Sequence, residues 1–114
     1  MQTQQFLAEY EISTDPHRLN VEVIHNFLAE SYWSPGIPRA IVERATQNSL
    51  CFGVYHHTSQ VGFARVVMDK STFALLADLF ILEPHRGKGL SKWLMRSVIG
   101  HEDLQGFPEN LKSP

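Results

Sequence analysis

The chain of 114 residues has little cysteine and no long apolar run. Because Cys51 is its only cysteine, an intramolecular disulfide is impossible, and this usage is typical of the reducing cytoplasm. Apolar runs such as Leu79–Leu82 are far shorter than the roughly 20 residues of a membrane-spanning helix. The first residues also lack the basic start and apolar stretch of a secretory signal. We therefore expect a cytoplasmic protein without a membrane partner.

The chain also lacks a large excess of positive or negative charge. The formal net charge is −2 and the isoelectric point is about 6.3, which argues against a nucleic-acid partner. With 43% apolar and 19% charged residues, the composition is that of a globular protein, and the length suits a single domain over residues 1–114.

The cations are nevertheless concentrated in one segment, between Pro84 and Gly100. This segment contains four cations and no acid, so the rest of the chain carries −6. Either a solvated helix face or an anion-binding site would explain the cluster. The four residues are Arg86, Lys88, Lys92 and Arg96.

Hydrophobic periodicity predicts one strand, two helices, three strands and a third helix. The expected strands are Phe6–Ile12, Leu50–His56, Val61–Met68 and Phe73–Leu82; the expected helices run from about Arg18 to Ser31, from Pro38 to about Asn48, and from Gly89 to about Gly100. The short connections between the last three strands require antiparallel neighbours. The fold class is therefore α/β (α+β), with helices on both faces of a mainly antiparallel sheet.

Three details of these elements can be checked directly. In the second helix, Ile41 and Ala45 are expected on the inner face. In the third, one face carries Leu90, Trp93, Leu94, Ser97 and Val98. The strand Phe73–Leu82 is apolar on both faces except at Asp78, which predicts a central strand covered on both sides.

A glycine-rich turn, Arg86-Gly87-Lys88-Gly89-Leu90-Ser91, joins that strand to the third helix. Glycines allow a sharp turn and close approach of a ligand, and a helix N-terminus presents free N–H groups to an anion. A Walker loop is excluded because no glycine lies four residues ahead of a Gly-Lys-Ser/Thr. A dinucleotide fingerprint is excluded because Lys92 occupies the position of its third glycine.

With these residues the chain resembles the GNAT superfamily of acetyltransferases, which bind acetyl-CoA. That family's loop pattern, Arg/Gln-x-x-Gly-x-Gly/Ala, is matched by Arg86 and Gly89, whereas Ser91 departs from its last position. The segment Asp78–Met95 looks like the family's fourth strand, loop and third helix, and Gln60–Arg65 resembles its third strand. The element order β-α-α-β-β-β-α agrees as well, and the resemblance covers most of the chain.

The resemblance implies acetyl-CoA as cosubstrate and a primary amine, on a small molecule or a peptide, as acceptor. It implies that the pantetheine arm pairs with one strand, that the pyrophosphate lies on the amides of the glycine turn, and that Arg86 shapes this loop. The residues so assigned are Leu79, Phe80, Ile81, Arg86, Gly87, Lys88, Gly89, Leu90, Ser91 and Lys92.

The catalytic groups are less well defined. Asp78 and Glu83 are candidates for the general base, although Asp78 can also be a structural acid with a partner and Glu83 a solvated one. Tyr32 and Trp33 lie where the family admits its acceptor, and they either line a substrate pocket or cap the core. No tyrosine follows the third helix, where the family's general acid usually lies. The alternative function is therefore a weak or inactive CoA-binding module, and a third possibility is a domain that binds no nucleotide.

Other polar and reactive residues are given ordinary roles. Cys51 is expected to be a small core residue, and Arg65 to be exposed or paired with an acid. His56 and His57 are expected to be surface histidines, because no Cys or carboxylate cluster shares their spacing, and no metal is predicted.

The family fold usually continues with a strand, a helix and another strand, whereas residues 101–114 offer only an irregular tail. We therefore expect a C-terminally shortened domain that forms a homodimer or higher oligomer, which would cover the exposed sheet edge.

Overall fold

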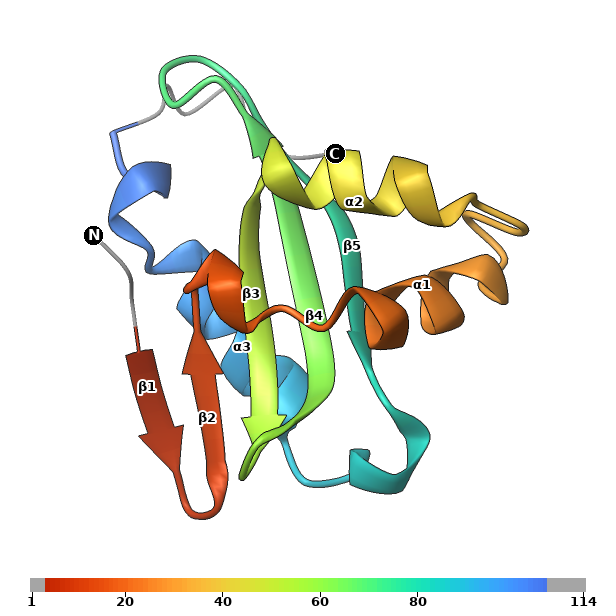
Figure 1. The fold of residues 1–114 in the computed structure, drawn as a ribbon. Coiled ribbons are helices and arrows are strands. Elements are labelled where there is room, and N and C mark those ends of the chain that lie inside the picture. Colours follow the sequence, from red (N-terminus) through yellow and green to blue (C-terminus); the bar gives the residue numbers. More distant parts are fainter. Residues whose placement is uncertain (1–3, 107–114) are drawn as a thin grey trace.

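A five-stranded antiparallel sheet dominates the computed structural model, which describes residues 4–106 (Figure 1). The strands follow one another across the sheet in sequence order, so each pairs with the next along the chain. They are β1 (Gln4–Leu7), β2 (Tyr10–Ser13), β3 (Leu50–His56), β4 (Ser59–Met68) and β5 (Ala74–Ile81). The antiparallel sheet and α+β class predicted from the sequence are confirmed.

The first predicted strand, Phe6–Ile12, is wrong as a continuous element. The chain folds back at Ala8 and Glu9, where Ala8 adopts a φ of 53°, and makes the hairpin β1–β2. The apolar alternation that suggested one strand carries no burial information here, since Phe6 is 72% exposed. The observed order is therefore β-β-α-α-β-β-β-α.

Two helices lie between β2 and β3 and cover one face of the sheet (Figure 1). Helix α1 (Val21–Ala29) begins after Asn20, whose side chain accepts a hydrogen bond from the Val23 N–H. Helix α2 (Arg39–Gln47) begins after Pro38. These starts lie within a few residues of the positions expected from the sequence.

The buried face of α2 differs from the prediction by about one position. Val42 and Thr46 face the sheet, whereas Ile41 is 42% exposed and Ala45 is only half-buried. Residues 41 and 42 are both apolar, so the sequence did not define which of the two phases is buried.

Helix α3 (Leu90–Ile99) covers the opposite face, and its predicted buried set is confirmed residue by residue. Alternation along β3 and β4 divides the core between the two faces: Phe52 and Ala64 pack in the cluster with α3, whereas Cys51 and Phe63 pack in the cluster with α1 and α2. Short 3-10 helices complete the structure at Pro16–Arg18, Glu83–His85 and Glu102–Leu104.

Strand β5 was expected in the centre of a sheet but is an edge strand within residues 4–106. Its register with β4 shifts between the pairs Arg65–Asp78 and Val66–Leu76, so that Ala77 has no partner and forms a bulge. Residues 107–114, most of the predicted irregular tail, lie outside the described part of the chain. The shortened domain and the oligomer therefore stay predictions.

The strands of the sheet are closely packed around Gly62. At Gly62 an added Cβ would lie 2.7 Å from Ile81 Cδ1 and 3.0 Å from Val54, so a larger residue would have to displace side chains on both neighbouring strands. None of the helices in residues 4–106 has both the length and the apolar character needed to cross a bilayer.

A pair of substitutions in α2 tests the orientation of this helix. Val42→Ala should lower the free energy of unfolding by about 2 kcal/mol, because it removes two fully buried methyl groups and leaves a cavity. Ile41→Ala, the matched control, should change it by less than about 0.5 kcal/mol. Urea unfolding followed by circular dichroism measures both values, and equal losses would contradict the observed phase.

Candidate functional site

The glycine turn after β5 has the backbone geometry of an anion-binding loop. Gly87 and Gly89 have φ values of 79° and 80°, a region that favours glycine, and an added Cβ at either would meet no atom within 4 Å. The space over the loop is therefore open, and glycine is needed there for its backbone conformation.

Helix α3 starts at this loop without a side-chain cap. Gly89 is the N-cap residue, and the first intrahelical bond runs from the Trp93 N–H to the Gly89 carbonyl. The N–H groups of Leu90, Ser91 and Lys92 consequently have no partner within the helix and lie at its positive end. The exposed side chains of Lys88 and Lys92 add positive charge.

Arg86 connects the loop to the preceding strand. Its Nε donates a hydrogen bond of 2.8 Å to the Ile81 carbonyl oxygen, so the guanidinium lies across the end of β5. Glu83, one of the two candidate bases, is exposed on the 3-10 helix between them, in agreement with a solvated acid.

The free edge of β5 offers backbone groups next to this loop. The Leu82 N–H donates to the Val61 carbonyl, so by alternation Phe80 also directs its peptide groups toward β4. Leu79 and Ile81 direct theirs to the other side, where residues 4–106 place no strand. The three residues assigned to the pantetheine arm thus differ in the direction of their peptide groups. Those of Phe80 point toward β4, whereas those of Leu79 and Ile81 point away from it.

Asp78 is buried, with 5% of its surface exposed, and both of its carboxylate oxygens have partners. Arg65 Nε donates to Oδ2 at 2.6 Å and Trp33 Nε1 donates to Oδ1 at 2.7 Å. Arg65 also donates through Nη1 to Ser49 Oγ at 3.2 Å. Arg65 is therefore paired with an acid, and Asp78 has the partners expected of a structural acid.

Trp33 and Tyr32 behave differently in the loop between α1 and α2. The Trp33 ring lies 6.0 Å from Phe27, which stacks on Phe80 at 3.9 Å. Tyr32 is 91% exposed and contacts Trp33 edge-on. Trp33 thus combines a contact to the core with a hydrogen bond to Asp78, a connection across 45 residues that the sequence did not reveal.

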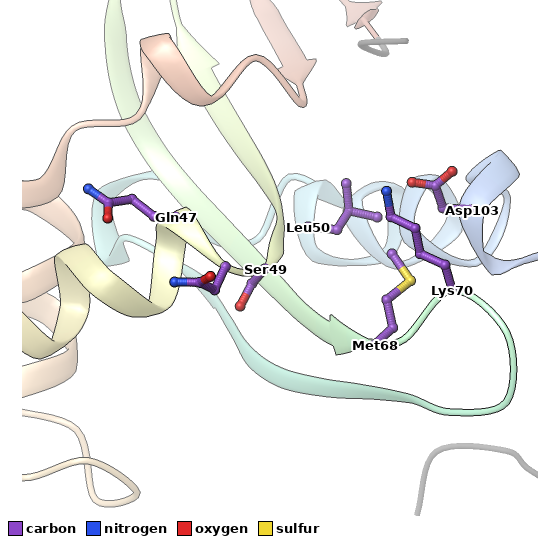
Figure 2. Close-up of a pocket in the computed structure, with 7 residues that line it drawn as sticks. Gln47, Ser49, Leu50, Met68, Lys70 and Asp103 are labelled. Atoms are coloured by element: carbon purple, nitrogen blue, oxygen red, sulfur yellow. The ribbon is translucent and has the colours of Figure 1, made fainter.

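Two surface hollows differ in their relation to these residues. One of about 430 Å³ lies between α1 and the end of β5, next to the Phe27–Phe80 stack; it is lined by Val23, Asn26, Phe27, Glu30, Ser31 and Leu82. Another, of about 340 Å³, is formed by the end of α2, the start of β3, the end of β4 and Asp103 (Figure 2). Neither hollow is lined by a predicted site residue, but the first contains Phe27, which contacts Trp33 and stacks on Phe80, so the first is the candidate acceptor site.

Two ionisable side chains outside this region, those of Cys51 and Tyr55, are kept in the neutral form by burial. Cys51 is buried and its pKa is raised to about 12, chiefly by burial, which confirms a core residue. Burial likewise raises the pKa of Tyr55 to about 12. Neither group can supply an anion at neutral pH.

An antiparallel sheet whose edge strand runs into an uncapped, glycine-rich helix start defines a class of α+β proteins suited to holding an extended, phosphate-bearing ligand. The acetyltransferase (GNAT) family model matches residues 8–111. The chain belongs to this family.

Individual relatives agree with this assignment. A Gibberella zeae protein, named provisionally as an acetyltransferase, is 32% identical in an alignment that covers 89% of this chain and 67% of that protein. A crystal structure from Xanthomonas campestris pv. campestris, assigned provisionally to the same family, shares 47% identity and a TM-score of 0.84 over 86% of this chain and 70% of that one. A Staphylococcus aureus protein of unknown function, 18% identical over 91% of this chain and 76% of that one, shares the fold with a TM-score of 0.67.

The single thiol allows a direct test of the buried site around Cys51. In the native protein at pH 8, labelling with a disulfide reagent should be about 10³-fold slower than for a free thiol, because a pKa of about 12 leaves little thiolate. Labelling should become fast once guanidinium unfolds the chain. Rapid native labelling would contradict the burial and the inert role.

Proposed function

We propose that the protein is an acetyl-CoA-dependent N-acetyltransferase that transfers the acetyl group directly to a primary amine. The observation that carries this proposal is the continuity between the edge of β5, on which residues 4–106 place no further strand, and the glycine turn at the start of α3. An extended ligand with a phosphate group at one end can lie along both.

The residues present fit the cosubstrate. Gly87 and Gly89 leave open space above the loop, and the N–H groups of Leu90, Ser91 and Lys92 are available to a pyrophosphate. The Ser91 hydroxyl, where the family has glycine or alanine, is exposed and adds a possible donor. Lys88 and Lys92 supply charge, and Arg86 fixes the loop through Ile81.

The peptide groups of Leu79 and the N–H of Ile81, whose carbonyl is taken by Arg86, would hold the pantetheine arm in the manner of an added strand. The thioester of acetyl-CoA supplies the activated acetyl group. Near the bulge at Ala77, the Leu79 N–H is placed to polarise a carbonyl oxygen at the open edge. Acetyl-CoA bound along β5 would face an amine bound in the hollow beside Phe27. The two substrates would then react largely through proximity.

On the acceptor side we assign Asp78 to positioning, in preference to proton transfer. Its two oxygens already accept from Arg65 and Trp33, and this arrangement holds the indole against Phe27 beside the candidate acceptor site. An aromatic face in such a place suits recognition of a cationic amine.

The alternative function is CoA binding with little or no turnover. The positions of the three tyrosines are the reason to retain this alternative. A general acid must reach the leaving thiolate. Tyr55 is buried in the core, and the Tyr10 hydroxyl is bonded to His85 Nδ1 at 2.9 Å. Tyr32 is the exposed one, in the loop between α1 and α2.

Calorimetry with acetyl-CoA, followed by measurement of CoA release with a panel of amines, separates the two functions. Absence of binding at millimolar ligand would overturn both.

Gly89→Val tests the loop. The β-branched side chain is strained at a φ of 80° and projects into the space assigned to the pyrophosphate, so affinity for acetyl-CoA should fall at least about 10-fold. Calorimetric titration measures this. Gly106→Val is the matched control, since Gly106 has the same φ and the same open surroundings away from the loop, and it should leave the affinity unchanged. An equal loss in both variants, or none in the first, would contradict the assignment.

Asp78→Asn distinguishes the two roles of this carboxyl group. For a positioning residue we expect the KM for the amine to rise about 10-fold while kcat and the KM for acetyl-CoA change little. Trp33→Phe, which removes the indole donor, should reproduce this split. Steady-state kinetics over a range of pH measures both variants. A fall in kcat of about 10²-fold or more for Asp78→Asn alone, with loss of the basic limb of the pH profile, would identify a general base instead.

A further inference from the structure

Two hairpin turns lie next to each other at the end of the sheet where α3 begins (Figure 1). Strand β2 pairs with β3 through Tyr10 and His56, which places the β1–β2 turn beside the β3–β4 turn. Glu9 belongs to the first turn and His57 to the second, where His57 adopts a left-handed φ of 56°. Glu9 and His57, which are 48 positions apart in the sequence, are thereby brought together.

The side chains of Glu9, His56 and His57 converge on one point. His57 Nε2 lies 3.5 Å from Glu9 Oε1, and His56 Nε2 lies 3.8 Å from Glu9 Oε2. One ligand atom from each of the three residues lies within 4.8 Å of the other two. The two imidazole rings have centroids 4.4 Å apart.

We propose that Glu9, His56 and His57 bind one divalent transition-metal ion of the Zn²⁺ class. Two imidazole nitrogens and a carboxylate oxygen are a ligand set that zinc uses, with water at the remaining position. The sequence-based expectation of ordinary surface histidines lacked the carboxylate, which the β1–β2 turn supplies.

The separations are compatible with one ion. Ligands about 2.0–2.1 Å from a tetrahedral zinc are about 3.3 Å apart, and the two carboxylate–imidazole distances, each to a different oxygen of Glu9, are 3.5 and 3.8 Å. Both exceed the length of a charge-assisted N–H···O bond, about 2.8 Å, so neither ring is held by a direct hydrogen bond to the carboxylate. Small rotations of these side chains would bring one oxygen and both nitrogens onto a common ion.

Neighbouring rings hold His56 in place. Tyr10 packs against the His56 ring at 4.9 Å, and the Tyr10 hydroxyl is bonded to His85 Nδ1. The His85 ring in turn lies 5.3 Å from His56. His56 is therefore partly buried in an aromatic cluster, with 31% of its side chain exposed, which lowers the entropy cost of ordering this ligand.

The site is separate from the proposed acetyl-transfer site. Its ligands come from the β1–β2 and β3–β4 turns, whereas the glycine loop and the acceptor side come from β5, α3 and the α1–α2 loop. Metal binding can therefore be measured without acetyl-CoA or an amine, and its failure would leave the proposed transferase function untouched.

The experiment is a calorimetric titration of ZnCl₂ into the full chain, prepared without a histidine tag and treated with chelator. We expect one Zn²⁺ per chain with micromolar affinity. His57→Gln and Glu9→Gln should each weaken binding at least 10-fold. His17→Gln is the matched control, because His17 is a histidine with 90% of its side chain exposed outside the cluster, and it should bind like the parent.

Co²⁺ in place of Zn²⁺ adds a spectroscopic measurement. A tetrahedral site with nitrogen and oxygen ligands should give intense visible absorption that His57→Gln removes and His17→Gln retains. Thermal melts of the chelated variants confirm that each is folded, as expected for exposed turn residues. Absence of saturable binding up to millimolar Zn²⁺, or equal binding by the parent and by His57→Gln and Glu9→Gln, would overturn the proposal.

Discussion

The ion pair between Arg65 and Asp78 is the interaction on which the candidate site depends. These residues are register partners on β4 and β5, and Asp78 is almost fully buried. Removal of Arg65 would leave the buried Asp78 carboxylate without its counter-charge, which costs about 3–5 kcal/mol. The carboxylate also accepts from the Trp33 indole N–H, and Arg65 donates to Ser49 between α2 and β3, so the ion pair joins the sheet to the α1–α2 loop and to the segment before β3.

The site itself is built from opposite requirements on its two sides. The acceptor side is built from stacked rings and a buried ion pair. The loop side is defined by open space, uncapped N–H groups and two glycines in the left-handed region. Substrate positioning needs fixed side chains, whereas a phosphate is held best by backbone groups that nothing else covers.

The parts of the fold that could be predicted are those where one residue pattern has one structural solution. Leu90, Trp93, Leu94, Ser97 and Val98 define a single helical face, and short polar turns require antiparallel neighbours, so both predictions were correct. The strand limits of β3 were also correct, because polar residues flank its apolar run.

The errors arise where local patterns are ambiguous or where contacts cross the chain. The adjacent apolar residues 41 and 42 allow two phases of α2, and an exposed edge gives the β1–β2 hairpin no burial signal. The Trp33–Asp78 bond and the approach of Glu9 to His57 depend on packing between distant segments, which spacing along one sequence does not encode.

The contact between Arg86 and the Ile81 carbonyl also has a meaning for self-association in solution. An edge strand with free peptide groups can template cross-β stacking with other copies. At the end of β5 that carbonyl is occupied by a charged guanidinium, and the neighbouring lysines are of the same sign. Within residues 4–106, the like charges on two copies would therefore oppose edge-to-edge pairing at this end of β5.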